Sequence, residues 1–372
     1  MSYQYRTRKV TRQPQREFRP GNGRISGYSS LFLGGINLAA VLAYLYPSYL
    51  TTTELRAGYD GEALQVVLKY SMWLALFFGV VTVVINRRKR MGIAGIALTA
   101  IAFAAGGYSI PVGAVEAKPL ALGVDWLILA FLGSTVIFTT LEKLFPKYRH
   151  QLILRKEWQL DFWYFCFNHL LISAVILVGN FAVAQSQWAM NHNLHQWVQS
   201  LPLWGQVLLL LLAADFVLYW EHRIYHEIPR LWKFHAVHHS VENLDWLAGS
   251  RAHVTQVFIE RTLVVLTLYF LGGSKTALDI YVTIAALQAL IIHCNLGFSW
   301  GWLKHIIVTP QYHHWHHSSE APAIDTNYAA HTTLCDRLFG TYHLPGKHWP
   351  AQYGTTKKLP SNFLGQLFYP FK

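Results

Sequence analysis

The stretch LLLLLAADFVLYWEHRIYHEIPRLWKFHAVHHS, residues 208–240, joins an apolar membrane-type segment directly to histidine-rich sequence. It holds two histidine clusters with the spacings HxxxH and HxxHH, formed by His222/His226 and by His235/His238/His239. Residues three or four apart share one face of a helix, so each cluster can direct its imidazoles at one point. Pro229 suits the first turn of a new helix. We therefore expect two helices, joined by a tight turn, that close on one site.

A third cluster with the spacing HxxHH follows in TPQYHHWHHSS, residues 309–319, and contains His313, His316 and His317. His293 ends another apolar segment, and we expect it to be a further ligand. Neutral imidazole is the commonest metal ligand in proteins. A structural zinc site needs about four ligands, so this set predicts two metal ions. The alternative, a series of unrelated surface or core histidines, does not explain the repeated spacing.

The composition indicates an integral membrane protein. Hydrophobic residues make up 53% of the 372 residues and charged residues 13%, against about 25% charged in soluble domains. We predict an all-α fold, a polytopic membrane helical bundle of about eight spans with a cytoplasmic helical histidine-rich cap. A span needs roughly 20 apolar residues, and the candidates are residues 29–46, 68–86, 92–112, 122–141, 162–184, 203–221, 256–272 and 276–293.

Lysine and arginine follow the alternation expected of a multi-pass chain. They crowd residues 6–24, 87–90 and 143–156, whereas residues 186–202 contain none. Basic loops stay in the cytoplasm, so both termini and all histidine clusters are expected there, and the first span is expected to be a retained anchor. The formal charge of +12 is then a juxtamembrane feature that attracts lipid headgroups, and we expect no nucleic-acid partner. The three cysteines are scattered, and no disulfide is expected.

Four domains are expected from these patterns. Residues 1–27 form a disordered basic arm, and residues 28–145 form an accessory transmembrane module. Residues 146–345 form the catalytic domain that contains the histidine clusters. Residues 346–372, rich in aromatic side chains and lysine, form a tail that lies at the membrane interface.

Two further residues are candidates for the site. Asp215 lies two helical turns before His222, and an acid inside an apolar span is a functional candidate by default. It could accept a hydrogen bond from a ligand imidazole, pair with a buried arginine, or serve helix packing. His253 could be a ligand, a partner of a ligand, or a surface residue. His314 points about 100° away from its neighbours on the helix and is expected to be a non-ligand.

The ligand types favour redox chemistry on a lipid. Nitrogen ligands without thiolates suit iron, zinc, nickel or copper, and Arg230 stands where a zinc-protease HExxH motif would need its second histidine. Two irons with open positions could activate O2, and a site at the membrane surface could receive a lipid chain. The alternatives are a histidine-rich metal transporter and a zinc-dependent lipid hydrolase.

The motifs DFVLYWEHRIYHEIPRLWKFHAVHHS, SRAH, IIHCNLG, TPQYHHWHHS, NY and DRLFGT occur in order between residues 215 and 341. This series resembles the fatty acid hydroxylase/sterol desaturase superfamily of integral membrane di-iron oxygenases, over roughly residues 155–345. The resemblance implies O2-dependent oxidation of a lipid C–H bond, two iron ions (with zinc possible in purified protein), and a separate cytochrome b5-, ferredoxin- or reductase-like electron donor. It also implies ligation by the nine histidines above and adds Asn327 as a candidate. The family's usual acid after the SRAH-type histidine is Gln256 here.

Overall fold

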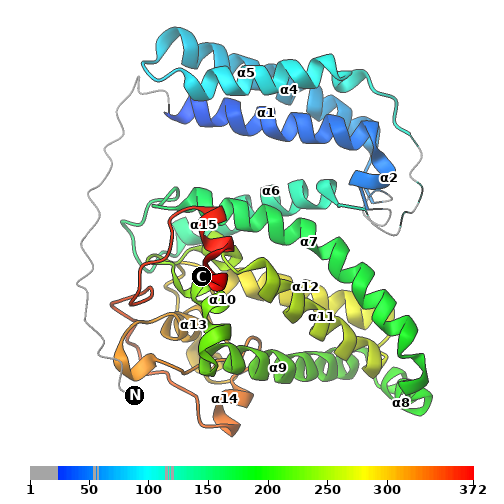
Figure 1. Cartoon of the computed structure of the whole chain (residues 1–372), viewed down its shortest axis with the longest axis vertical. Coiled ribbons are helices and arrows are strands. Elements are labelled where there is room, and N and C mark those ends of the chain that lie inside the picture. The colour runs from blue at the N-terminus through cyan, green and yellow to red at the C-terminus, as the bar shows by residue number, and fades with distance from the viewer. Residues whose placement is uncertain (1–23, 53–55, 57, 114–115, 117, 119–120) are drawn as a thin grey trace. The chain divides into compact units, whose positions relative to one another are not determined.

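The computed structural model describes residues 24–52, 56, 58–113, 116, 118 and 121–372 (Figure 1). Within these ranges the chain is helical, and its β-structure consists of three isolated bridges. The predicted all-α class is thus confirmed. The expected arm, residues 1–27, lies outside the described residues except for its last four, which belong to α1 (Arg24–Leu45).

Seven of the described helices are long and apolar enough to cross a membrane, and the chain is an integral membrane protein. They are α1, α4 (Gly61–Ile85), α5 (Arg90–Ala104) extended through η1 (Gly107–Ser109), α6 (Val124–Leu144), α7 (Trp158–Gln185), α9 (Leu203–Glu227) and α11 (Val254–Leu271). The eighth expected span corresponds to α12 (Lys275–Ile291), which has 17 residues. At 1.5 Å per residue it is about 25 Å long, slightly shorter than the hydrocarbon core.

The chain divides into two compact units, and the boundary lies inside α6 between Leu132 and Gly133. The sequence placed the start of the catalytic domain later, at residue 146. We call the described residues from Arg24 to Leu132 the N-terminal unit and those from Gly133 to Lys372 the histidine unit. The last turns of α6 belong to the histidine unit because Phe138, Thr139 and Glu142 contact Trp246.

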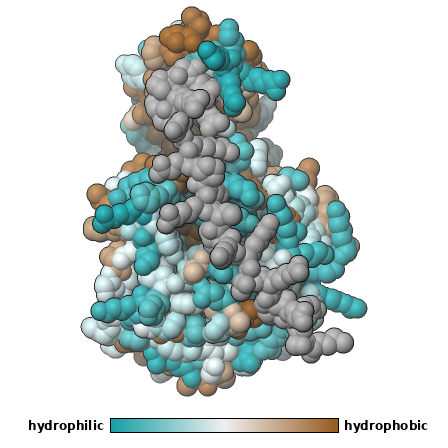
Figure 2. All heavy atoms as spheres, turned by 90° about the vertical axis from the view of Figure 1, so that its left-hand side faces the viewer, coloured by the Kyte–Doolittle hydropathy of each residue, from teal (hydrophilic) through white to brown (hydrophobic). Residues whose placement is uncertain are grey.

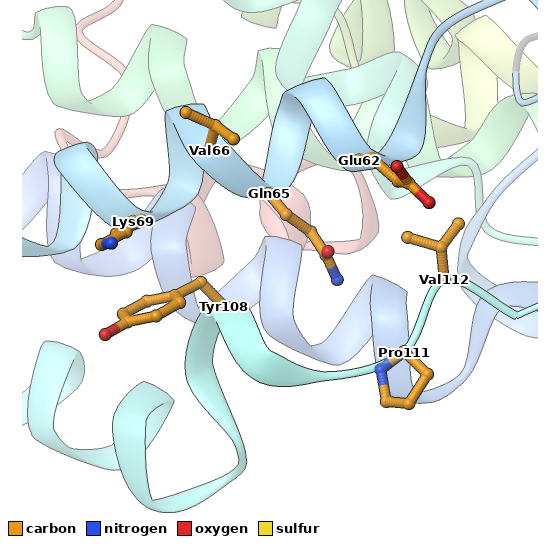
Figure 3. Close-up of a pocket in the computed structure, with 7 residues that line it drawn as sticks. All are labelled: Glu62, Gln65, Val66, Lys69, Tyr108, Pro111 and Val112. Atoms are coloured by element: carbon orange, nitrogen blue, oxygen red, sulfur yellow. The ribbon is translucent and has the colours of Figure 1, made fainter.

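In the N-terminal unit, α1, α4 and α5 pack closely through small residues. Ser30 of α1 donates a hydrogen bond to the carbonyl of Ala75 in α4 at 2.9 Å. A Cβ atom on Gly95 of α5 would lie 2.5 Å from the backbone carbon of Ser30, so this crossing requires glycine. The unit also has an open cavity of about 560 Å³ (Figure 3), lined by Glu62, Gln65, Val66, Lys69, Tyr108, Pro111 and Val112.

In the histidine unit, α9 packs against α11 and α12 around an apolar core. This core consists of Leu210, Ala214, Val264, Leu268, Ala277, Tyr281 and Ala285. The short helix α8 (His192–Ser200) precedes α9. A single residue separates the end of α9 from the start of α10 (Pro229–His239). The histidine-bearing α10 and α13 (Pro310–His316) are shorter than the spans. Figure 2 shows this unit from the left-hand side of Figure 1, and hydrophilic side chains cover much of the surface seen there.

The C-terminal segment is integrated into the histidine unit. Leu359, Phe363 of α15 (Phe363–Leu367) and Tyr369 of η6 (Tyr369–Phe371) pack against Tyr164 of α7 and Val237 of α10. Other apolar side chains of this segment are exposed, namely Leu364, Phe368 and Phe371. The tail expected to lie at the membrane interface therefore has one face buried against protein, a contact that its composition did not indicate.

Candidate metal centre

All nine histidines that the sequence selected converge in the histidine unit as two groups. In each group, one ring nitrogen from every member lies within 4.8 Å of the others. The five-histidine group consists of His222, His226, His235, His239 and His316. The four-histidine group consists of His238, His293, His313 and His317. Each HxxHH cluster thus contributes to both groups, whereas the HxxxH cluster of α9 contributes to one.

Backbone carbonyls fix the orientation of several imidazoles. The Nδ1 atom of His222 lies 2.7 Å from the carbonyl oxygen of Tyr328, and that of His316 lies 2.9 Å from the carbonyl oxygen of Thr326. A carbonyl oxygen can only accept, so Nδ1 carries the proton in both rings. The same argument applies to His238 and His293, whose Nδ1 atoms donate to Arg251 and Ala289. In these four rings Nε2 has a free lone pair.

The Nε2 atoms within each group approach one another at distances typical of a shared metal ion. The Nε2 atoms of His222 and His235 are 2.9 Å apart, and those of His239 and His316 are also 2.9 Å apart. In the four-histidine group, Nε2 of His293 lies 3.2 Å from that of His238 and 2.9 Å from that of His313.

His238 and His293 both keep an unprotonated Nε2 atom, and two such atoms 3.2 Å apart repel unless a cation lies between them. Ligands at right angles on one ion, each about 2.1 Å from it, are about 3 Å apart. The residues present therefore fit a metal ion in each group. The Nε2 atom of His226 supports this, because it is buried and has no hydrogen-bond partner among the described residues.

Burial keeps the ligands neutral. Desolvation lowers the pKa of His235, His239, His316 and His317 well below the ordinary value of 6.5, and neighbouring imidazoles lower it further. Burial also lowers the pKa of His238 to about 4. The rings therefore offer lone pairs throughout the physiological pH range, as metal ligation requires.

Gln256 of α11 holds a ligand imidazole through a neutral side chain. Its Oε1 atom lies 3.1 Å from Nδ1 of His235. An amide oxygen can accept this proton as a carboxylate would, although without the negative charge that raises ligand basicity. Asp325, by contrast, places a carboxylate oxygen 3.2 Å from Nδ1 of His226. The five-histidine group is thus held by both kinds of acceptor.

The other three candidate residues lie outside both groups. Asp215 accepts hydrogen bonds from the backbone of Ala330, His331 and Thr332 and from the Thr332 hydroxyl. It does not contact a ligand imidazole in the described structure, because seven helical residues separate it from His222 by about 10 Å along the axis. Asp215 instead anchors residues 330–332. These residues follow Tyr328, whose carbonyl accepts the Nδ1 proton of His222.

His253 and Asn327 are occupied by other hydrogen bonds. His253 caps α11, with Nδ1 accepting from the backbone of Thr255 and Nε2 donating to the carbonyl of Leu367. The Asn327 side chain donates to the carbonyls of Tyr312 and His343 and accepts from the backbone of His343. His314 also lies outside both groups, with Nε2 donating to the carbonyl of Cys294. Neither His253 nor Asn327 has a free nitrogen or oxygen directed at the metal groups.

A buried ion network next to the four-histidine group was not found from the sequence. Arg155 binds both carboxylate oxygens of Asp245, at 2.7 and 2.9 Å, and contacts Asp161 at 2.5 Å. Arg251 binds Asp161 as well, and also Glu157 at 3.0 Å. The network fixes Arg251, whose carbonyl accepts the proton of His238. Arg155 and Asp245 are 90 residues apart in the sequence, and so are Asp161 and Arg251. The sequence feature that could have indicated the network is the presence of charged residues in a largely apolar chain.

Comparison with known proteins agrees with this architecture. Residues 207–341 match the family described as fatty acid hydroxylase. Ornithine lipid hydroxylase OlsE of Rhizobium tropici is 33% identical over 261 residues, which cover 66% of this chain and 76% of the relative. The chain belongs to the fatty acid hydroxylase family. No solved structure matches it.

Other members of the fatty acid hydroxylase family match over a shorter region. Alkylglycerol monooxygenase of Homo sapiens is 31% identical over 145 residues, which are 39% of this chain and 32% of the relative. Methylsterol monooxygenase 1-2 of Arabidopsis thaliana is 26% identical over 139 residues, which are 37% of this chain and 46% of the relative. The family resemblance inferred from the motifs is confirmed, and the relatives place the chain among membrane-bound oxidoreductases.

Proposed function

We propose that this protein is a membrane-bound di-iron oxygenase that uses O2 to oxidise a C–H bond of a lipid. The observation that carries the proposal is the pair of buried groups in which imidazole Nε2 atoms converge at 2.9–3.2 Å. Nine nitrogen ligands suit two borderline transition-metal ions and leave positions open on each. The names of the relatives, which are hydroxylases and monooxygenases, favour iron as the working metal, although purified protein could carry zinc.

Bound iron would supply the redox chemistry that activates O2. The overall reaction would be R–H + O2 + 2e⁻ + 2H⁺ → R–OH + H2O. The chain's own residues hold the ligands in this scheme. Carbonyls of Tyr328, Thr326, Arg251 and Ala289 fix one tautomer of their imidazoles, and burial of the rings excludes water from the ligand atoms. Such anchoring contacts typically change metal affinity 10–100-fold.

The membrane architecture supports a lipid substrate. His222 and His226 lie at the C-terminal end of the long apolar helix α9, and His293 follows the C-terminal end of α12. Both helices therefore lead from the apolar bundle to the site, which a lipid could approach from the bilayer. The relatives' names mention ornithine lipid, alkylglycerol and methylsterol. We propose an acyl chain of a polar membrane lipid, because the ornithine lipid hydroxylase matches over most of its length.

Orientation and partners complete the proposal. The basic residues of the loops favour a cytoplasmic position for the histidine groups and both termini. Electrons would come from a separate cytochrome b5-, ferredoxin- or reductase-like protein. Hydroxylation, desaturation and ether cleavage would use the same site, and the position of the substrate would decide among them.

A histidine variant with a matched control tests the proposal. His316→Ala removes a ligand of the five-histidine group, whereas His305→Ala changes an exposed histidine outside both groups. We expect His316→Ala to lose iron and lipid turnover while it still inserts into membranes, and His305→Ala to keep both. Turnover is measured as incorporation of isotopically labelled O2 into membrane lipids, with lipidomics of a deletion strain to find the substrate. Full activity of His316→Ala, or product formation without O2, would contradict the oxygenase assignment, and the latter would favour the hydrolase.

A further inference from the structure

The four-histidine group is anchored unevenly. His238 and His293 each donate an Nδ1 proton to a backbone carbonyl. The Nδ1 atoms of His313 and His317 are buried and have no hydrogen-bond partner among the described residues. The positions of His238 and His293 therefore depend on defined backbone segments, and these segments set the geometry to which the other two rings must conform.

The 3₁₀ helix η3 (Trp246–Ser250) links these two anchored ligands. It leads directly to Arg251, whose carbonyl holds His238. It also packs against the ring of His293, because a Cβ atom on Gly249 would lie 2.8 Å from Nδ1 of His293. A displacement of η3 would thus move the supports of both ligands.

One carboxylate oxygen from α6 holds η3 and the turn after His293 together. Oε1 of Glu142 accepts a hydrogen bond from the backbone N–H of Trp246 at 2.8 Å and another from that of Asn295 at 2.9 Å. Trp246 is the first residue of η3, and Asn295 is the second residue after His293. Both N–H groups donate to the same oxygen, so Glu142 connects the two segments directly.

The residues that follow Glu142 form further backbone hydrogen bonds with the segment after His293. The backbone of Lys147 donates to the carbonyl of Asn295 at 3.2 Å, and the backbone of Gly297 donates to the carbonyl of Phe145 at 2.8 Å. A Cβ atom on Gly297 would lie 2.8 Å from the Cα atom of Lys147, so the approach is as close as backbones allow. The end of α6 and residues 145–148 therefore lie against the segment that carries His293.

We propose that Glu142 is a positioning residue for the four-histidine group. It acts through the backbone of Trp246 and Asn295 and sets the spacing between His238 and His293. Glu142 lies outside residues 207–341, the region that matches the family, so the role assigns α6 to the metal centre. The proposal rests on the proposed metal function, and its test separates the two.

The test compares three variants of the full-length protein. Glu142→Leu keeps the size of the side chain but removes the acceptor, and Glu142→Gln keeps an oxygen that can occupy the Oε1 position. Glu62→Leu is the matched control, because Glu62 is an exposed glutamate of the N-terminal unit. We expect Glu142→Leu to fall from two metal ions per chain to one, and Glu142→Gln and Glu62→Leu to retain two. Metal content is measured by mass spectrometry after iron reconstitution.

A second measurement needs no metal. The backbone N–H of Gly297 donates to the carbonyl of Phe145, and that of Arg251 donates to the carbonyl of Ala248. Neither bond involves the Glu142 side chain, so hydrogen–deuterium exchange of these two N–H groups reports on the segments that Glu142 holds. In metal-free protein, we expect both groups to exchange at least severalfold faster with Glu142→Leu than with Glu142→Gln.

The outcomes distinguish the two proposals. Unmodified protein that does not bind two metal ions would contradict the proposed function. Two tightly bound ions and unchanged hydrogen exchange at Gly297 and Arg251 in Glu142→Leu would overturn the role of Glu142 alone. Equal loss from both groups, or a defect in Glu142→Gln as large as that in Glu142→Leu, would also overturn it, because the acceptor oxygen would then not be the selective cause.

Discussion

Replacement of Asp161 by asparagine removes the central charge of the buried ion network. Asp161 is fully buried and contacts both Arg155 and Arg251, whose side chains are 4% and 0% exposed. Each arginine would keep one carboxylate partner, Asp245 or Glu157. Breaking a buried pair costs about 3–5 kcal/mol, because a desolvated charge loses its compensation. The asparagine oxygen still accepts one hydrogen bond, so we expect a loss near the lower end, about 3 kcal/mol.

The assay is unfolding of the purified protein in detergent, followed by tryptophan fluorescence against temperature and denaturant. Asp279→Asn is the matched control, since Asp279 pairs with Lys275 on α12 and their side chains are 63% and 85% exposed. Such exposed pairs contribute about 0.3–0.5 kcal/mol. Asp161→Asn should also weaken metal binding, because Arg251 holds His238. Equal stability of the two variants would refute the idea that the network supports the fold.

Two further predictions concern the four-histidine group. Burial lowers the pKa of His238 from 6.5 to about 4, so between these pH values the unfolded metal-free chain binds a proton that the folded chain does not. The free energy of unfolding should therefore fall as pH drops from 6.5 to 4 and stay level above 6.5. A denaturation midpoint that does not change with pH would contradict this prediction. Gly249→Ala would place a Cβ atom 2.8 Å from Nδ1 of His293 and should lower metal content and turnover, whereas Gly133→Ala, whose Cβ atom would meet nothing within 4 Å, should leave both unchanged in the same metal and lipid assays.

The sequence identified the members of the site because helical spacing is a local property. HxxxH and HxxHH place imidazoles on one face, and the structure brings all nine selected rings together. The sequence pattern could not show that the nine histidines divide into two groups. That division depends on how α10 and α13 meet, so that His239 lies against His316 while His238 lies against His317.

Interactions between distant segments were the part that sequence reasoning could not supply. Asp215 was placed on the correct helix, but its partners, residues 330–332, are more than 110 positions away. No motif marks Arg155 or Glu142 in the sequence, yet Arg155 binds Asp245 and Glu142 accepts a hydrogen bond from the backbone of Trp246. Side-chain pairing of this kind leaves no periodic pattern in the chain.

The hydrogen bonds between residues 145–148 and residues 295–297 set a lower limit on the part of the chain that can work independently. A fragment that contains residues 207–341 would include every metal ligand but would lack Arg155, Asp161 and the carbonyl of Phe145. The unit that holds the two histidine groups is therefore larger than the region that matches the family. Transplanting the histidine motifs into another membrane protein, or exchanging N-terminal helices between relatives, would require the end of α6 to be carried along.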